Sequence, residues 1–147
     1  MSGAVTIVIG GEPVAKGRPR MTRRGIVYTP ASTRRYEAHG RLAAQQAMDG
    51  RPPIAVPVRV EIMIDLPVPA SWSMKRRDAA LRGDIRPTAR PDADNYVKAA
   101  LDAINAIVAT DDSLVVDLAA AKRYARVPKL TIMVAPHPAL TAQGRSA

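Results

Sequence analysis

Hydrophobic and polar side chains alternate along residues 58–66, where every second position from Val58 to Ile64 is a branched aliphatic residue. A period of two is typical of a β-strand that buries one face. Four other segments are predicted as strands because of their apolar and β-branched residues: residues 4–9, 25–29, 114–124 and 129–135.

Helical spacing is clearest over residues 94–109, where one apolar stripe is formed by Val97, Leu101, Ile104 and Val108. Two further helices are predicted, one rich in Ala and Gln and one rich in basic residues. They are expected to begin near Ser32 or Thr33, as caps, and at residue 71, and to end near residues 48 and 82.

The order of these elements is β-β-α-β-α-α-β-β. It predicts a small α+β domain in which a mixed or antiparallel sheet packs against two to three helices. Nothing in the 147 residues indicates a linker or an internal repeat, so one domain over residues 1–147 is expected. The tail after about residue 136 is expected to be flexible.

Composition excludes several classes of protein. With 47% hydrophobic residues the chain is not mainly disordered, and without cysteine it holds no disulfide, thiolate metal site or cysteine nucleophile. Two histidines exclude a multi-histidine metal site. No apolar run approaches the roughly 20 residues of a membrane span, and the N-terminus lacks the features of a secretory signal. A soluble, cytoplasmic protein without membrane contact is expected.

Charge is the most informative property of the composition. The chain has 22 Lys and Arg against 13 Asp and Glu, a net charge of +9, which favours a polyanionic partner such as nucleic acid. Six of the 13 acids nevertheless lie within residues 92–117, where Lys98 is the only basic residue. These acids are Asp92, Asp94, Asp102, Asp111, Asp112 and Asp117. An acidic island in a basic protein repels phosphate unless a cation lies between them, which suggests a divalent metal.

The acids also have simpler explanations. Asp92 and Asp94 follow Pro91 at a predicted helix start, where a carboxylate can cap the helix and interact with its dipole. Asp94, Lys98 and Asp102 are spaced by four, so they share one helix face and could form ordinary ion pairs. The Asp111-Asp112 pair could simply form a polar turn. The functional hypothesis requires these acids to face Asp92 and Asp94.

Carboxylates without thiol or histidine partners favour a hard cation, Mg²⁺ or Mn²⁺, over Zn²⁺. Such an ion neutralises phosphate charge and activates water for phosphodiester hydrolysis. In that interpretation Lys98 positions water or stabilises the developing charge. Two basic segments are candidates for DNA contact, although solvated surface charge would also explain them. They are the predicted loop with Lys16, Arg18, Arg20, Arg23 and Arg24, and the helix with Lys75, Arg76 and Arg77.

Two other observations depend on geometry. Lys122 and Arg123 are consecutive strand residues that point to opposite faces, so at most one should face the site. Trp72 and Tyr96 could stack on an unpaired base, but buried or rim positions are expected instead.

Four motifs occur in order between about Glu12 and Ala135: Lys16-Gly-Arg-Pro-Arg20, Arg90-Pro-Asp-Ala-Asp-Asn-Tyr-Val-Lys98, Asp111-Asp-Ser and Lys122-Arg-Tyr124. Together they resemble the RusA family of Holliday-junction resolvases. The resemblance implies a RusA-like fold and a Mg²⁺-dependent crossover junction endodeoxyribonuclease, with Mn²⁺ as a possible substitute. Such an enzyme acts as a homodimer and nicks two strands of a four-way DNA junction symmetrically, in recombination and repair.

Carried over by position, the family's catalytic acids fall on Asp92, Asp94 and Asp112, and its essential lysine falls on Lys98. Asp111 is the adjacent metal-ligand candidate. The family also suggests a bacterial or phage-encoded protein. Two alternatives stay open: a less selective nuclease for branched or single-stranded DNA, and a catalytically inactive DNA-binding module.

Overall fold

The computed structural model describes residues 3–17 and 20–138, and its elements follow the predicted order with one additional short strand. Arg18 lies outside the described part, and so do the residues from 139 on, which make up most of the tail predicted to be flexible. The elements are β1 (Val5–Gly10), β2 (Arg20–Met21), β3 (Val27–Tyr28), α1 (Ala31–Met48), β4 (Val58–Leu66), α2 (Met74–Arg82), α3 (Ala93–Ile104), the short 3-10 helix η1 (Asp112–Leu114), β5 (Val115–Tyr124) and β6 (Lys129–Pro136).

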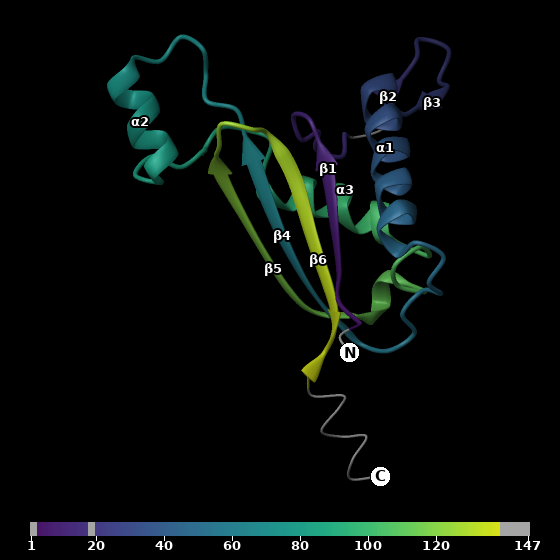
Figure 1. Cartoon of the computed structure of the whole chain (residues 1–147). Coiled ribbons are helices and arrows are strands. Elements are labelled where there is room, and N and C mark those ends of the chain that lie inside the picture. Colours follow the sequence, from purple (N-terminus) through teal and green to yellow (C-terminus); the bar gives the residue numbers. More distant parts are fainter. Residues whose placement is uncertain (1–2, 18–19, 139–147) are drawn as a thin grey trace.

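Four strands form a mixed sheet in the order β1-β6-β4-β5 (Figure 1). β6 is antiparallel to both of its neighbours, whereas β4 and β5 are parallel. In this order β5 is an edge strand, because it pairs only with β4. β2 and β3 form a separate antiparallel hairpin. The structure confirms the predicted α+β class, a mixed sheet with three helices.

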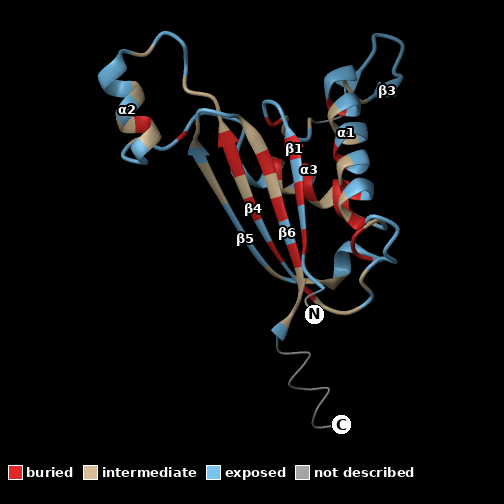
Figure 2. Ribbon diagram, in the orientation of Figure 1, coloured by how far each residue is buried: buried red, intermediate tan, exposed pale blue. Residues whose placement is uncertain are grey.

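The core lies between one face of the sheet and the helices α1 and α3 (Figure 2). Alternate residues of β1 and β4 are buried, as the period of two predicts. Gly40 of α1 is the point of closest approach, because a Cβ there would lie 3.1 Å from both Ala103 of α3 and Ile9 of β1. Small residues therefore let α1 contact α3 and the sheet together.

The helix predicted over residues 94–109 is shorter than expected and ends at Ile104. Residues 105–110 leave the helix and bond to residue 54, whose amide donates to the Val108 carbonyl at 2.7 Å. Val108 is still fully buried, so its hydrophobicity serves the core without helical continuation. The buried stripe of α3 also runs along Tyr96, Ala100 and Ala103, beside the predicted one.

Two features of the N-terminal half differ from the sequence-based expectation. α1 begins at Ala31 with Pro30 in the N-cap position, and no side chain caps it, so Ser32 and Thr33 do not act as caps. The basic segment expected as a loop contains β2, because residues 20–21 pair with residues 27–28 across a turn that includes Gly25.

Candidate active site

Asp92 and Asp94 lie at the start of α3 with exposed carboxylates. Asp92 holds the N-cap position, yet its side chain makes no capping hydrogen bond. In α2, by contrast, the Ser73 hydroxyl accepts a hydrogen bond from the Arg76 amide at 3.2 Å. Capping therefore does not account for Asp92. The Asp94 carboxylate lies 3.9 Å from the Lys98 ammonium, one helical turn along.

These side chains line a hollow of about 580 Å³ at the α3 N-terminus. Its lining combines two carboxylates, the Asn95 amide and three cationic side chains, those of Lys16, Arg90 and Lys98. Carboxylate and amide oxygens are hard donors that suit Mg²⁺ or Mn²⁺. The donor set of Asp92 and Asp94 therefore fits a hard divalent cation, with cations nearby that can hold a phosphate.

The segment around Lys16 is attached to α3. Its backbone amide donates to the Asn95 carbonyl at 3.1 Å, and its ammonium contacts the Asp102 carboxylate at 2.6 Å. The hydrogen bond to Asp102 raises the pKa of Lys16 above its ordinary value, against a smaller opposing effect of burial. The predicted DNA contact of Lys16 therefore competes with an ion pair that keeps this segment beside the hollow.

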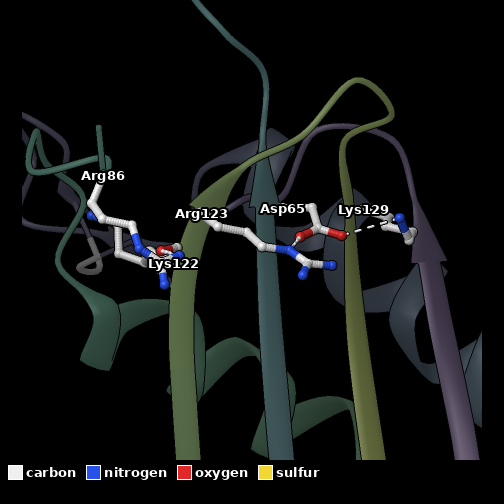
Figure 3. A network of polar contacts seen from close by, with 5 residues as sticks. All are labelled: Asp65, Arg86, Lys122, Arg123 and Lys129. Carbon is white, nitrogen blue, oxygen red and sulfur yellow. Dashed lines mark hydrogen bonds and ion pairs between the residues drawn. The ribbon is translucent and has the colours of Figure 1, made fainter. Parts of the chain in front are cut away.

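Lys122 holds the segment that precedes Asp92. Its ammonium donates to the carbonyl oxygens of Ala89 at 3.0 Å and Pro91 at 2.9 Å, while Arg86 donates to the Lys122 carbonyl at 3.2 Å (Figure 3). Lys122 is thus anchored on β5 and fixes the backbone from which Asp92 projects. Sequence reasoning missed this role. No local pattern signals it, because the register that places Lys122 beside the buried Ile64 exists only in the assembled sheet.

Arg123 points to the other face of the sheet, as the strand alternation requires. Its guanidinium donates to the fully buried Asp65 carboxylate at 2.5 Å, and the Lys129 ammonium lies 3.1 Å from the second oxygen (Figure 3). Burial alone would raise the pKa of Asp65, but the hydrogen bonds and charges of Arg123 and Lys129 outweigh it and lower that pKa. The prediction that at most one of Lys122 and Arg123 faces the site is confirmed.

The two aromatic candidates are engaged within the protein. Tyr96 is only 3% exposed, and burial raises its pKa, with a smaller contribution from the charge of Glu12. Trp72 packs edge-on against Tyr124 with ring centroids 5.3 Å apart, and the Arg76 guanidinium lies 3.8 Å from the Trp72 ring centroid. These contacts agree with the buried and rim positions expected for the two side chains.

Asp111 and Asp112 lie at the opposite end of β5 from this hollow. Asp111 caps η1, because its carboxylate accepts a hydrogen bond from the Ser113 amide at 3.1 Å, and that bond lowers its pKa. Asp112, in the first turn of η1, is exposed. The polar-turn explanation therefore accounts for Asp111 but leaves the Asp112 carboxylate available.

The separation of the two acidic pairs follows from the elements between them. The backbone before Asp92 contacts Lys122, and Lys122 is seven strand residues beyond Val115, about 23 Å at 3.3 Å per residue. The 12 residues of α3 give about 18 Å along the helix axis. Within the described residues of this chain, no three Asp, Glu, His or Cys side chains are grouped so that they could hold a metal ion. One chain thus brings together Asp92, Asp94 and Lys98 but leaves Asp111 and Asp112 on the order of 20 Å away.

The predicted basic segments belong to two separate elements, the β2–β3 hairpin and α2. Arg20, Arg23 and Arg24 are exposed on the β2–β3 hairpin. Lys75 and Arg76 are exposed on α2, while Arg77 is half-buried and donates to the Pro69 carbonyl at 3.4 Å. Figure 1 shows the hairpin and α2 at opposite sides of the molecule, with α3 between them. None of the helices within the described ranges combines the length and apolar character needed to cross a bilayer.

A small mixed α+β fold thus presents two exposed carboxylates and three cationic side chains around one hollow at the start of α3. Residues 10–135 match the family model of endodeoxyribonuclease RusA. A Bacillus subtilis (strain 168) relative, the uncharacterized protein YqaN, is 38% identical over 137 residues, in an alignment that covers 88% of this chain and 94% of that protein. The chain belongs to the RusA endodeoxyribonuclease family, as its motifs predict.

Proposed function

We propose that this protein is a Mg²⁺-dependent, structure-selective endodeoxyribonuclease that resolves four-way DNA junctions by paired, symmetric phosphodiester hydrolysis, in recombination and repair. Family membership supports an endodeoxyribonuclease that acts on branched DNA. The observation that carries the proposal is a pair of exposed carboxylates, Asp92 and Asp94, that make no capping hydrogen bond and lie beside Lys98 in one hollow. A helix that needed only a capped, solvated start would have no use for this arrangement.

In this proposal, Asp92 and Asp94 hold the divalent ion, and Mn²⁺ can replace Mg²⁺. When bound, the ion supplies charge neutralisation and a water of lowered pKa. Lys98 stabilises the charge that develops on the phosphate, or positions the attacking water. Lys122 keeps the backbone before Asp92 in place, and the arginines of the β2–β3 hairpin bind the DNA backbone.

The active form in this proposal is a homodimer in which Asp112 of a second copy, with Asp111 beside it, completes the metal site. Two observations support this arrangement. One chain keeps the acidic pairs on the order of 20 Å apart, and β5, which spans most of that distance, is one of the two edge strands of the sheet. Two antiparallel β5 strands related by a two-fold axis would bring the start of one beside the end of the other. A two-fold enzyme also matches two equivalent cuts.

The two alternatives differ from this proposal in measurable ways. An inactive DNA-binding module would use Asp92 only as a cap, and the absence of a capping bond counts against it. A less selective nuclease would use the same residues, so competition between junction and linear DNA has to separate them. Preference for the junction supports the proposal, and equal cleavage of both substrates favours the less selective enzyme.

The test is cleavage of a labelled synthetic four-way junction, with a linear duplex of the same sequence as competitor. Wild-type protein is expected to make paired symmetric nicks with Mg²⁺ or Mn²⁺ and none without metal. Asp94→Asn should abolish cleavage while leaving metal-free junction binding equal or tighter, because it removes negative charge beside the phosphate. The control is Asp49→Asn, an identical change at the exposed C-cap of α1, where Asn also tolerates the left-handed backbone. Uncut junctions, or an Asp94→Asn variant with wild-type activity, would refute the proposal.

A further inference from the structure

A second hollow, of about 590 Å³, adjoins the one that contains the carboxylates. The two share Ala15, Gly17 and Pro91, so only the segment around residues 15–17 and Pro91 separates them. A DNA strand whose phosphate lies at Asp92 and Asp94 would therefore have its neighbouring backbone at this second hollow. None of the residues predicted as metal ligands or catalytic groups lines it.

One wall of the second hollow is the N-terminus of α1, which lies beside the β2–β3 hairpin (Figure 1). The first intrahelical hydrogen bond runs from the Arg34 amide to the Pro30 carbonyl at 3.1 Å. The amides of Ala31, Ser32 and Thr33 have no acceptor among the residues that the structure describes. The first turn also contains no acidic residue. This 18-residue helix therefore presents free donors and the positive end of its dipole.

Thr33 provides a second observation that points to a ligand. Its side chain lines the hollow although the residue is only 5% exposed, and its hydroxyl has no hydrogen-bond partner among the described residues. The hydroxyl faces the wall shared by the two hollows, because a Cβ built on Gly17 would lie 3.2 Å from it. A hydroxyl that lines the hollow and has no partner within the protein can donate a hydrogen bond to a ligand there.

The chemistry of the lining identifies the class of ligand. The lining offers free amides, two hydroxyls and the Arg20 guanidinium, which are hydrogen-bond donors suited to a ligand that accepts hydrogen bonds and carries negative charge. Glu12 is the single carboxylate among the described residues of the lining, and it is exposed. We propose that the α1 N-terminus, with Ser32 and Thr33, binds a backbone phosphate of the DNA strand next to the scissile phosphate. This inference rests on the proposed function and deepens it, because it assigns a position on the substrate to a second site.

The decisive variant is Ser32→Asp, which places a carboxylate in the first turn of α1. The helix dipole favours a carboxylate there, so the melting temperature should stay equal or rise. The same negative charge should repel a phosphate and weaken its binding. Two variants serve as controls: Ser32→Asn, similar in size but neutral, and Ala38→Asp, the same change in charge at an exposed position six residues further along α1. Opposite effects on stability and DNA affinity would distinguish a phosphate site from a merely structural helix start.

Binding is measured by fluorescence anisotropy of a labelled four-way junction without divalent metal, across a range of salt concentrations. Ser32→Asp is expected to bind about fivefold more weakly than Ser32→Asn at low salt. The slope of log K against log salt should also fall by about 0.9, the value for one phosphate contact. Thr33→Val should weaken binding in the same direction, and Glu12→Gln should not weaken it. Ala38→Asp should weaken binding clearly less than Ser32→Asp, because its charge lies about 9 Å further along the helix.

Equal affinities for Ser32→Asp, Ser32→Asn and Ala38→Asp would overturn the inference while leaving the proposed function intact. If wild-type protein bound no DNA at all, the proposed function would fail, and this inference with it. Inorganic phosphate provides the remaining arm. If phosphate raised the melting temperature of wild type while Ser32→Asp left DNA affinity unchanged, the hollow would be a site for a free anion, which also contradicts the inference.

Discussion

Lys122→Met tests whether a residue outside the acidic island positions the metal ligands. The substitution keeps most of the aliphatic side chain but removes the ammonium that donates to the carbonyls of Ala89 and Pro91 at 3.0 and 2.9 Å. Asp92 follows Pro91 directly, so its backbone loses two fixed points while its own side chain is unchanged. The expected defect is therefore in metal binding, and DNA affinity should change little.

The size of the effect follows from the two hydrogen bonds. A hydrogen bond to a charged group contributes about 1.5–3 kcal/mol when its loss leaves a partner unsatisfied. The freed carbonyls lie in an exposed segment and can bind water, so we expect a net loss of about 1.4 kcal/mol for the pair together. That loss corresponds to a tenfold lower population of the competent arrangement. Half-saturation by Mg²⁺ should therefore rise about tenfold, with a nearly normal rate at saturating metal.

The assay is junction cleavage as a function of Mg²⁺ concentration, at saturating DNA. Arg123→Met is the matched control, because it removes the same charge from the adjacent residue of β5 on the opposite face. The control should keep its Mg²⁺ dependence and lose stability instead, since Asp65 would lose a partner. A Lys122→Met variant with an unchanged metal requirement, or one that only binds DNA more weakly, would refute the reasoning.

Two further predictions concern stability. Asp65→Asn should lower the free energy of unfolding at neutral pH by about 2 kcal/mol, because it leaves Arg123 and Lys129 without their buried partner. The folded pKa of Asp65 is lowered, so its stabilisation is present above the ordinary pKa of aspartate and is lost as the pH falls through the folded value. Melting curves of wild type and variant should accordingly converge below about pH 4, and a constant difference at all pH values would contradict this explanation. Gly40→Val should cost about 2 kcal/mol in chemical denaturation, because its side chain would collide with Ala103 and Ile9; an unchanged midpoint would show that α1 does not pack so closely.

Local patterns predicted much of this molecule from the sequence. The alternation along β4 and the acids after Pro91 depend on short-range geometry, and the structure places them as expected, with Asp92 and Asp94 at a helix start. The i, i+4 spacing likewise brought Lys98 beside Asp94. These features need only the pleat of a strand or the pitch of a helix.

Features that depend on contacts distant in sequence were not predictable in the same way. Residues 105–110 bond to Ile54 in place of continuing α3, although Val108 continues the helical spacing. Lys122 contacts backbone carbonyls more than 30 residues earlier, and such a contact leaves no local pattern. The distance between Asp92 and Asp112 is set by the lengths of α3 and β5 and by the pairing of β4 with β5, which only the assembled sheet reveals.

The most direct test of the account is a mixed dimer made from Asp94→Asn and Asp112→Asn chains, co-expressed with different affinity tags and purified by both. Each variant alone should be inactive. In the mixed dimer, a site built from two copies combines the intact Asp94 of one chain with the intact Asp112 of the other, so single metal-dependent nicks in the junction should return. If each chain built its own site, both sites of the mixed dimer would carry one substitution, and persistent inactivity would contradict the shared metal site.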